Sequence, residues 1–194
     1  MSESAEQIYE RARAAADAEG RLPMPPVDEW DAFPFEGELR VRPLQPPADE
    51  PPRLGEQGPD ECWRCQRRDD GVVWENDRWR VLALPEASGL PVVVTLQTRE
   101  HVDIDALPRR LAADLGPMIV RVERAVRAVG NIGRVHVCRW GDGSAHFHVW
   151  FMGRPARLPQ VRTSFAAIWD DILPPTPEDV WRTNLATVAE ALRA

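Results

Sequence analysis

The feature that most constrains the fold is one stretch of helical periodicity among short strand-like segments. Apolar residues recur at steps of three or four from residue 104 to residue 129, which is the spacing of a helix with one buried face. Segments rich in β-branched and aromatic residues lie on both sides of this stretch, at 72–76, 79–85, 91–97, 134–140 and 145–152. This order is typical of an α+β domain. We predict about five mostly antiparallel strands with one main helix, and extensions at both ends.

Turn-forming residues divide these segments. Residues 76–77 are Asn-Asp and predict a tight hairpin between the first two strands. Small and polar residues at 141–144 predict a second tight turn between the last two. Gly116-Pro117 lies inside the helical stretch, so we expect two helices there rather than one. Gly130 predicts the end of the second helix.

The flanking segments differ in character from the centre. Residues 2–19 predict a polar, Ala-rich helix, and residues 23–60 hold ten of the 19 prolines and predict an irregular arm. Two shorter helices are expected in the tail. We therefore predict three parts: a helix and Pro-rich arm (1–60), a central domain (61–156) and a helical extension (157–194).

Composition limits the classes of function. The net charge is −7 and all 24 basic residues are arginine, so a broad phosphate-coating surface for nucleic acid is not expected. The longest apolar run, at 90–94, is too short to cross a bilayer. The first residues carry charges of both signs without an apolar core, so we expect no secretory signal and a cytoplasmic protein. No membrane partner is expected.

A pair of cysteines suggests a metal site. Cys62 and Cys65 have C-x₂-C spacing, and in a reducing compartment this favours zinc over a disulfide. Zinc then needs two more ligands, which the four histidines can supply. The alternative is chance, because cysteine is often a small core residue.

Two of the four histidines lie close together in the last strand-like segment. Alternate residues of a strand share a face, so His146, His148 and Trp150 are expected to point the same way. Two neighbouring imidazoles at a strand end suggest a chemical role. The alternative is that both pack as half-exposed aromatic rings.

The order of these features resembles the histidine-triad (HIT) superfamily, over about residues 62–155. The C-x₂-C pair is followed by a hairpin, then by Gly89, a β-branched run, a helix, and HFHVWFMGR at 146–154. The family signature alternates three histidines with apolar residues, and here Trp150 stands in place of the third. There is some similarity to the galactose-1-phosphate uridylyltransferase branch, which has glutamine at that position.

The resemblance implies the roles of the reacting residues. His148 matches the nucleophile, which attacks the α-phosphorus of a nucleotide and forms a covalent nucleotidyl-histidine. We thus expect a nucleotidyl hydrolase or transferase acting on a small-molecule nucleotide. The expected substrate-binding residues are Trp150, Ser144, Gly143, Arg139 and Arg154.

The resemblance also implies a ligand set for a structural zinc ion. The matching positions are Cys62, Cys65, His101 and His146. Such a Cys₂His₂ site has no open position for substrate. The alternative partners of the two cysteines are His136 and Cys138, which lie on one face of the preceding strand.

Departures from the family pattern leave alternatives open. Trp150 replaces the third histidine, and Leu90 stands where many members have a fourth. The chain is therefore either an enzyme or an inactive HIT-like nucleotide-binding or scaffold module with zinc for stability. A third reading is a zinc hydrolase with His146 and His148 as ligands and Asp142 as the base. A homodimer is expected by resemblance, and the extensions either cover or enlarge its surface.

Overall fold

The computed structural model describes residues 4–25 and 30–194. The chain divides into two compact units, Met1–Pro51 and Pro52–Ala194. In the first unit, helix α1 (Ala5–Ala14) begins at a capping box in which Ser4 and Gln7 bond to one another's backbone amides. This helix is shorter than the predicted 2–19, and residues 2–3 lie outside the described part. The described residues from 15 to 51 form no further helix or strand.

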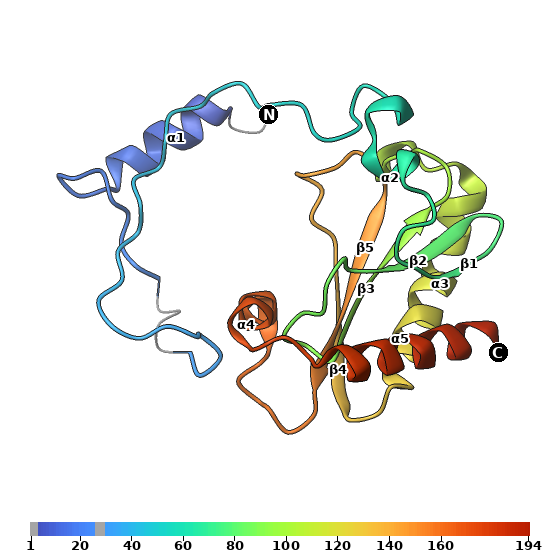
Figure 1. The fold of residues 1–194 in the computed structure, drawn as a ribbon. Coiled ribbons are helices and arrows are strands. Elements are labelled where there is room, and N and C mark those ends of the chain that lie inside the picture. The colour runs from blue at the N-terminus through green and yellow to red at the C-terminus, as the bar shows by residue number, and fades with distance from the viewer. Residues whose placement is uncertain (1–3, 26–29) are drawn as a thin grey trace. The chain divides into compact units, whose positions relative to one another are not determined.

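The second unit is built on one five-stranded sheet (Figure 1). Its strand order is β1-β2-β3-β5-β4, and every neighbouring pair is antiparallel. The strands are β1 (Val72–Glu75), β2 (Trp79–Ala83), β3 (Val92–Thr98), β4 (Ile132–Cys138) and β5 (His148–Pro155). The predicted α+β class and the five strands are confirmed. The β-branched run becomes β3, the central strand, and every residue of β3 is buried.

The last strand begins later than the sequence predicts. The pattern placed it at 145–152, but β5 begins at His148. The amides of Ala145 and Phe147 donate instead to the carbonyls of Leu54 and Val102. These two donors are therefore used by segments outside the sheet, and His146 lies in the connection before the strand.

The predicted break in the main helix does not occur. A short 3₁₀ turn, η3 (Ile104–Ala106), precedes one continuous helix, α3 (Arg109–Arg127), which contains Pro117. A proline removes the donor for the carbonyl four residues earlier, here that of Ala113. Both residues lie on the exposed face of α3, where water can bond to the freed carbonyl. The opposite face of α3 packs into the core, so the helix persists.

Helices cover both faces of the sheet (Figure 1). On one face, α3 and the C-terminal helix α5 (Glu178–Arg193) pack together on a core that includes Val94, Phe151 and Leu192. On the other face, the η4 turn (Thr163–Phe165) leads into α4 (Ala166–Ile172), which packs beside Leu90 and Met152. Because α4 is only seven residues long, part of this second face stays open.

Short segments complete the second unit. The 3₁₀ turn η2 (Pro59–Glu61) leads into one helical turn, α2 (Trp63–Gln66).

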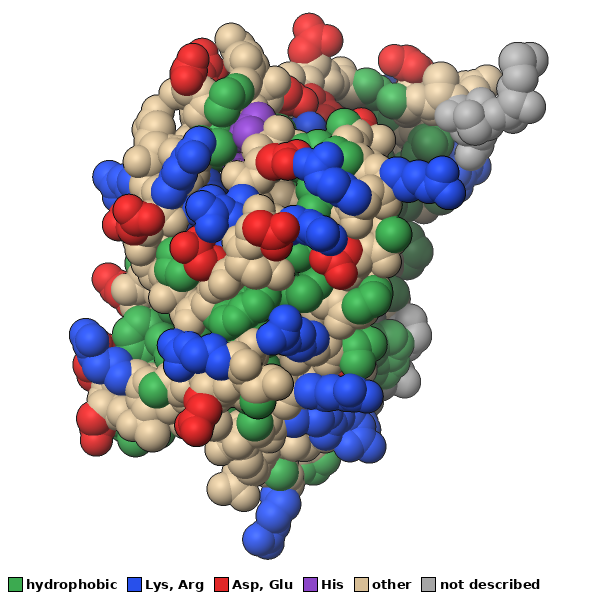
Figure 2. Space-filling view, turned by 90° about the vertical axis from the view of Figure 1, so that its right-hand side faces the viewer, with side chains coloured by type: hydrophobic (Ala, Val, Ile, Leu, Met, Phe, Trp, Pro, Cys, Tyr) green, Lys and Arg blue, Asp and Glu red, His purple; other side chains and the backbone are tan. Residues whose placement is uncertain are grey.

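The side that carries α3 and β1 in Figure 1 is turned toward the viewer in Figure 2. Apolar side chains gather there in a band bordered by arginine and acidic side chains. Within the described ranges, no helix has the length and apolar character needed to cross a membrane.

Candidate functional site

Four predicted metal ligands meet at one end of the sheet. Cys62 caps α2, Cys65 lies within it, His101 follows β3, and His146 precedes β5. The amide of Cys65 donates to the carbonyl of Cys62 over 2.9 Å, and this turn lets both sulfurs face the same point. One ligand atom from each residue lies within 4.8 Å of all the others. Segments far apart in the sequence thus converge on a single cluster.

The spacing of the ligand atoms fits a tetrahedral zinc ion. The Sγ of Cys65 lies 3.5 Å from Nδ1 of both His101 and His146, and the Sγ of Cys62 also lies 3.5 Å from Nδ1 of His146. Zinc–sulfur bonds of about 2.3 Å and zinc–nitrogen bonds of about 2.0 Å at a tetrahedral angle place sulfur and nitrogen roughly 3.5 Å apart. The four residues therefore fit zinc, and the set leaves no position for a substrate.

Backbone carbonyls orient both imidazoles toward the cluster. Nε2 of His101 lies 2.9 Å from the Gly55 carbonyl, and Nε2 of His146 lies 2.8 Å from the Thr98 carbonyl. Because a carbonyl only accepts, each Nε2 carries the proton and each Nδ1 offers its lone pair to a metal. This is the tautomer that a metal-ligating histidine requires.

Burial changes the proton affinities of the ligands. It lowers the pKa of His146 to about 4, so this imidazole is neutral near pH 7. Burial, with a hydrogen bond to Cys62, raises the pKa of Cys65 to about 11. Without a cation this thiol keeps its proton, and a bound zinc ion displaces that proton.

A segment before the cysteines closes over the cluster. Leu54 forms an isolated parallel bridge with Ser144. Gly55 has a φ of +76°, and an added Cβ there would lie 2.9 Å from Cβ of Cys62 and 3.0 Å from Cε1 of His101. Only glycine fits at this position without displacing a ligand. No short-range sequence pattern indicates this contact, because it depends on tertiary packing.

The cysteines do not use the alternative partners. His136 and Cys138 lie on β4, paired with Met152 and Trp150 of β5, and neither belongs to the described ligand cluster. Burial and the nearby charge of Arg154 lower the pKa of His136.

His148 lies beside the metal cluster but does not join it. It is the first residue of β5, and it pairs with Gln97 of β3. Its Nδ1 donates to the carbonyl of His146 over 2.8 Å. The imidazole is therefore oriented by a backbone carbonyl two residues earlier in the chain. Nε2 is the ring nitrogen left with a free lone pair. Trp150 follows on the same face, with the two ring centroids 6.4 Å apart.

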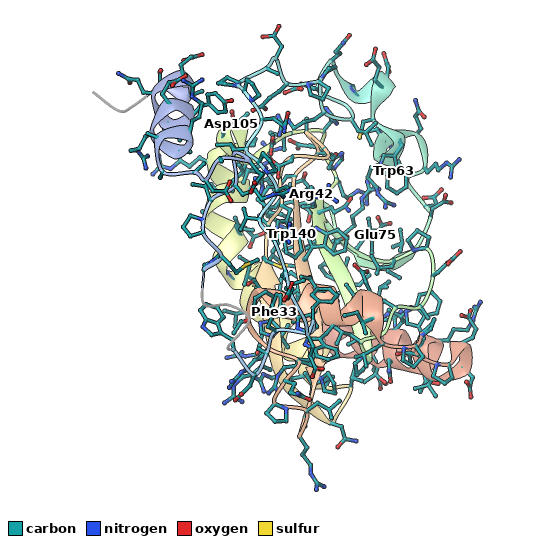
Figure 3. The ribbon with its side chains drawn as sticks, turned by 90° about the vertical axis from the view of Figure 1, so that its left-hand side faces the viewer. Phe33, Arg42, Trp63, Glu75, Asp105 and Trp140 are labelled. Atoms are coloured by element: carbon teal, nitrogen blue, oxygen red, sulfur yellow. The ribbon has the colours of Figure 1, made fainter. Side chains whose placement is uncertain are left out.

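A cavity of about 400 Å³ opens over this part of the sheet. His148, Gln97 and Thr95 form its floor, and Trp63, Trp140 and Trp150 lie around it; Figure 3 labels Trp63, which comes from α2, and Trp140, which follows β4. Arg64 also lines the cavity, and the described lining residues include no carboxylate. The surroundings therefore favour an anionic ligand that carries a flat ring.

Comparisons with known proteins identify the fold. No family model matches the sequence, and no curated protein matches it. Among solved structures, a HIT-like protein from Bartonella henselae aligns at a TM-score of 0.50 and 11% identity, covering 66% of this chain and 92% of that chain. The chain has the histidine-triad fold. This confirms the fold implied by the resemblance.

Two other solved structures are also similar to this chain. A zinc-bound histidine triad family protein from Mycobacterium smegmatis aligns at 18% identity with a TM-score of 0.49, covering 69% of this chain and 96% of that one. A structure titled uridylyltransferase aligns at 20% identity with a TM-score of 0.41, covering 79% of this chain and 53% of that one.

Within the HIT fold, the cavity brings together only some of the predicted substrate-binding residues. Gly143, Ser144 and Trp150 line it, beside His148. Arg139 forms an ion pair with Asp103 instead, and Arg154 donates to the carbonyl of Leu158, so neither arginine lines the cavity.

Asp103 fastens the loop that borders this HIT cavity. Its carboxylate accepts from Arg53 at 2.6 Å and from Arg139 at 2.5 Å, and Arg53 also donates to the carbonyl of Gly141. Burial raises the pKa of Asp103, but hydrogen bonds from the Ile104 amide and the two arginines outweigh it and hold the pKa below its usual value. Arg53 thus links Asp103, and through it Arg139, to the start of the loop at 141–144.

Arg64 and Gln97 are among the lining residues of the HIT cavity that the sequence did not predict. Arg64 lies between the two cysteines and is only 8% exposed. The Gln97 side chain is equally buried, and its Oε1 has no hydrogen-bond partner among the described residues. The pairing of β3 with β5 sets Gln97 opposite His148, a relation that becomes visible only once the strand register is known.

Proposed function

We propose that this protein is a nucleotidyl hydrolase or transferase in which His148 is the nucleophile. The observation that carries the proposal is the hydrogen bond from Nδ1 of His148 to the His146 carbonyl. It leaves Nε2 of an oriented imidazole in a cavity that has an arginine and no carboxylate among its described lining residues. A neutral imidazole is a good nucleophile near pH 7.

The reaction has two halves. Nε2 of His148 attacks the α-phosphorus, a P–N bond forms, and the bond to the leaving group breaks with its electron pair going to that group. Water or a second phosphate then attacks the same phosphorus. The P–N bond breaks, its electrons return to Nε2, and the proton of the attacking water passes to solvent. The leaving group is a phosphate chain, a sugar phosphate, or an amine that takes up a proton from solvent as it departs.

Neighbouring residues in the cavity suit a nucleotide. The Arg64 guanidinium supplies donors and a positive charge for phosphate oxygens. The exposed Trp140 ring offers a face on which a base can stack. Trp150 stands where the family has its third histidine, and its indole N–H can donate to a phosphate oxygen but cannot accept.

Zinc has a structural role in this proposal. When bound by Cys62, Cys65, His101 and His146, it would cross-link the segment before β1 to the residues that follow β3 and to those that precede β5. It thereby fixes the backbone of His146, whose carbonyl orients His148.

A second candidate function is an inactive HIT-like nucleotide-binding or scaffold module stabilised by zinc. Two observations favour it, both at positions where the family has histidines. Trp150, in place of the third histidine, lies in the cavity wall, and Leu90, in place of a fourth, is fully buried beside α4. The zinc-hydrolase reading has less support, because His148 does not belong to the described ligand cluster and Asp142 does not line the cavity.

A product assay with matched variants tests the proposal. The donors are adenosine phosphoramidate, a dinucleoside polyphosphate, and UDP-, GDP- and ADP-sugars. We expect turnover of at least one donor and a loss of about 10³-fold or more in His148→Ala, with zinc content unchanged. His136→Ala, which removes an imidazole outside the cavity, should keep its activity. Nucleotide binding without turnover of any donor would favour the inactive module.

A further inference from the structure

A second hollow adjoins the His148 cavity. It has a volume of about 740 Å³ and lies between α5, β1 and the segment after β2. The two hollows share a wall formed by Trp63, Arg64 and residues 83–85. The two hollows are therefore neighbours along this wall.

The second hollow is lined by apolar residues and by equal numbers of positive and negative charges. Its apolar lining includes Trp181, Leu185 and Ala186 of α5 and Val72 and Val73 of β1. The charged lining residues comprise three arginines and three carboxylates: Arg64, Arg67, Arg182, Asp70, Glu86 and Glu178. Such a lining suits an uncharged, ring-bearing group and gives no net attraction to an anion.

Arg64 marks the junction between the two hollows. Its guanidinium lies 4.0 Å from the centre of the Trp63 ring, and one of its N–H groups donates to the Asp70 carbonyl over 3.2 Å. Its Nε is buried and has no hydrogen-bond partner among the described residues. A buried guanidinium is costly when its hydrogen bonds are incomplete. Arg64 lines both hollows, so a phosphate group lying across the junction would offer acceptors to its guanidinium.

We propose that the second hollow is the leaving-group subsite of this protein, that it takes an uncharged ring, and that Arg64 binds the phosphate that joins this ring to the nucleotide. This inference rests on the proposed function and adds the leaving group to it. The α-phosphorus lies at His148, and the leaving group is a phosphate monoester whose ring contacts Trp181. When Nε2 attacks, the bond from the α-phosphorus to the bridging oxygen breaks, and that oxygen leaves with the electron pair.

Two esters of one nucleoside diphosphate test the subsite. The phenyl ester and the methyl ester release similar phosphate monoesters, but only the phenyl ester can fill the hollow. For the wild type we expect kcat/KM to be at least about tenfold higher for the phenyl ester, and the dissociation constant measured with His148→Ala to be lower by a similar factor.

Two variants alter the hollow in opposite ways. Trp181→Ala removes its indole, and Ala186→Trp fills it from an exposed position of α5. Both should reduce the preference for the phenyl ester to about twofold or less. Val180→Ala, on the same helix but outside the lining, should keep the preference.

The outcomes separate the two proposals. An unchanged preference in both altered variants, or no preference in the wild type, would overturn the subsite. Failure of the proposed function would appear differently, as no turnover of either ester, while the phenyl ester would still bind to His148→Ala more tightly than the methyl ester. Arg64→Ala should weaken binding of both esters, since both carry the joining phosphate; equal binding to this variant and its parent would contradict the role of Arg64.

Discussion

One hydrogen bond connects the cluster of candidate metal ligands to the proposed nucleophile. His146 offers Nδ1 to the cluster, while its backbone carbonyl accepts from Nδ1 of His148. Two histidines separated by one residue therefore have different proposed roles, because His146 is buried in the ligand cluster whereas His148 is half-buried in the cavity. Their types and spacing were readable from the sequence. The burial that separates their roles was not, because it depends on segments more than 40 residues away.

At the residue scale, the metal-free protein should lose stability in mild acid. The folded pKa of His146 is lowered by burial to about 4, below its value of 6.5 in the unfolded chain. This group therefore contributes stability that is fully present above pH 6.5 and is lost as the pH falls toward 4. The loss is roughly 3 kcal/mol at most. Thermal melting with a chelator between pH 7 and pH 4 measures it.

Two comparisons check the assignment to His146. In His146→Gln the acid-dependent loss should be smaller by the contribution of this one group, whereas His136→Gln should retain most of it. The same steep fall in the parent and in His146→Gln would show that other groups cause it.

At the scale of elements, β-branched runs and turn residues predicted the strands correctly, whereas a proline predicted a helix break that does not occur. The five strands follow from β-branched runs and turn residues, since both act within a few residues. Pro117 indicated a helix break, but tertiary packing of the opposite face of α3 holds the helix together. The segment at 53–55 contacts residues near 101 and 144, and no short-range pattern indicates such contacts. Arg64 and Gln97 escaped detection for the same reason.

Replacing Pro117 should stabilise the second unit. Pro117→Ala restores the donor to the Ala113 carbonyl on the exposed face of α3, and we expect the free energy of unfolding to rise by about 1–3 kcal/mol. Denaturant unfolding measures the change. Pro108→Ala, at the start of the same helix where no donor is needed, is the control and should change much less. Equal effects of the two variants would argue against this account of the helix.

Gly55 should prove necessary for metal binding. Gly55→Ala would place a Cβ against Cys62 and His101 at a positive φ, so we expect a loss of about 1–3 kcal/mol in stability and weaker zinc retention against a chelator. Gly58→Ala is matched in its loop and its positive φ but meets nothing within 4 Å. It should keep its zinc, and equal zinc loss from both variants would contradict the contact with Gly55.

At the scale of the whole molecule, the four candidate metal ligands come from segments that the sheet alone does not connect. Cys62 and Cys65 precede β1, whereas His101 and His146 lie at the ends of β3 and β5. The histidine-triad fold supplies the sheet and α3, and the C-terminal helices add α4 on one face and α5 on the other. The sequence predicted these helices as an extension, but it gave no indication that α5 borders a hollow beside the His148 cavity.

Removing zinc should destabilise the second unit as a whole. A chelator is expected to lower the melting temperature by roughly 10 °C or more, because zinc binding adds directly to the free energy of unfolding. Differential scanning calorimetry with and without one equivalent of zinc measures the shift. Cys65→Ser should melt near the chelated protein and show little response to zinc. A melting temperature that changes with neither zinc nor chelator would contradict a structural metal.

The most direct test of the central claim is the intact mass of the protein after mixing with the donor panel. Denaturing, alkaline conditions preserve a phosphoramidate bond to histidine. The proposed function predicts the added mass of one nucleoside monophosphate, present in the parent protein and absent in His148→Ala. An adduct that persists in His148→Ala would place the nucleophile elsewhere. Turnover of a donor with no adduct trapped at any time would contradict the covalent route.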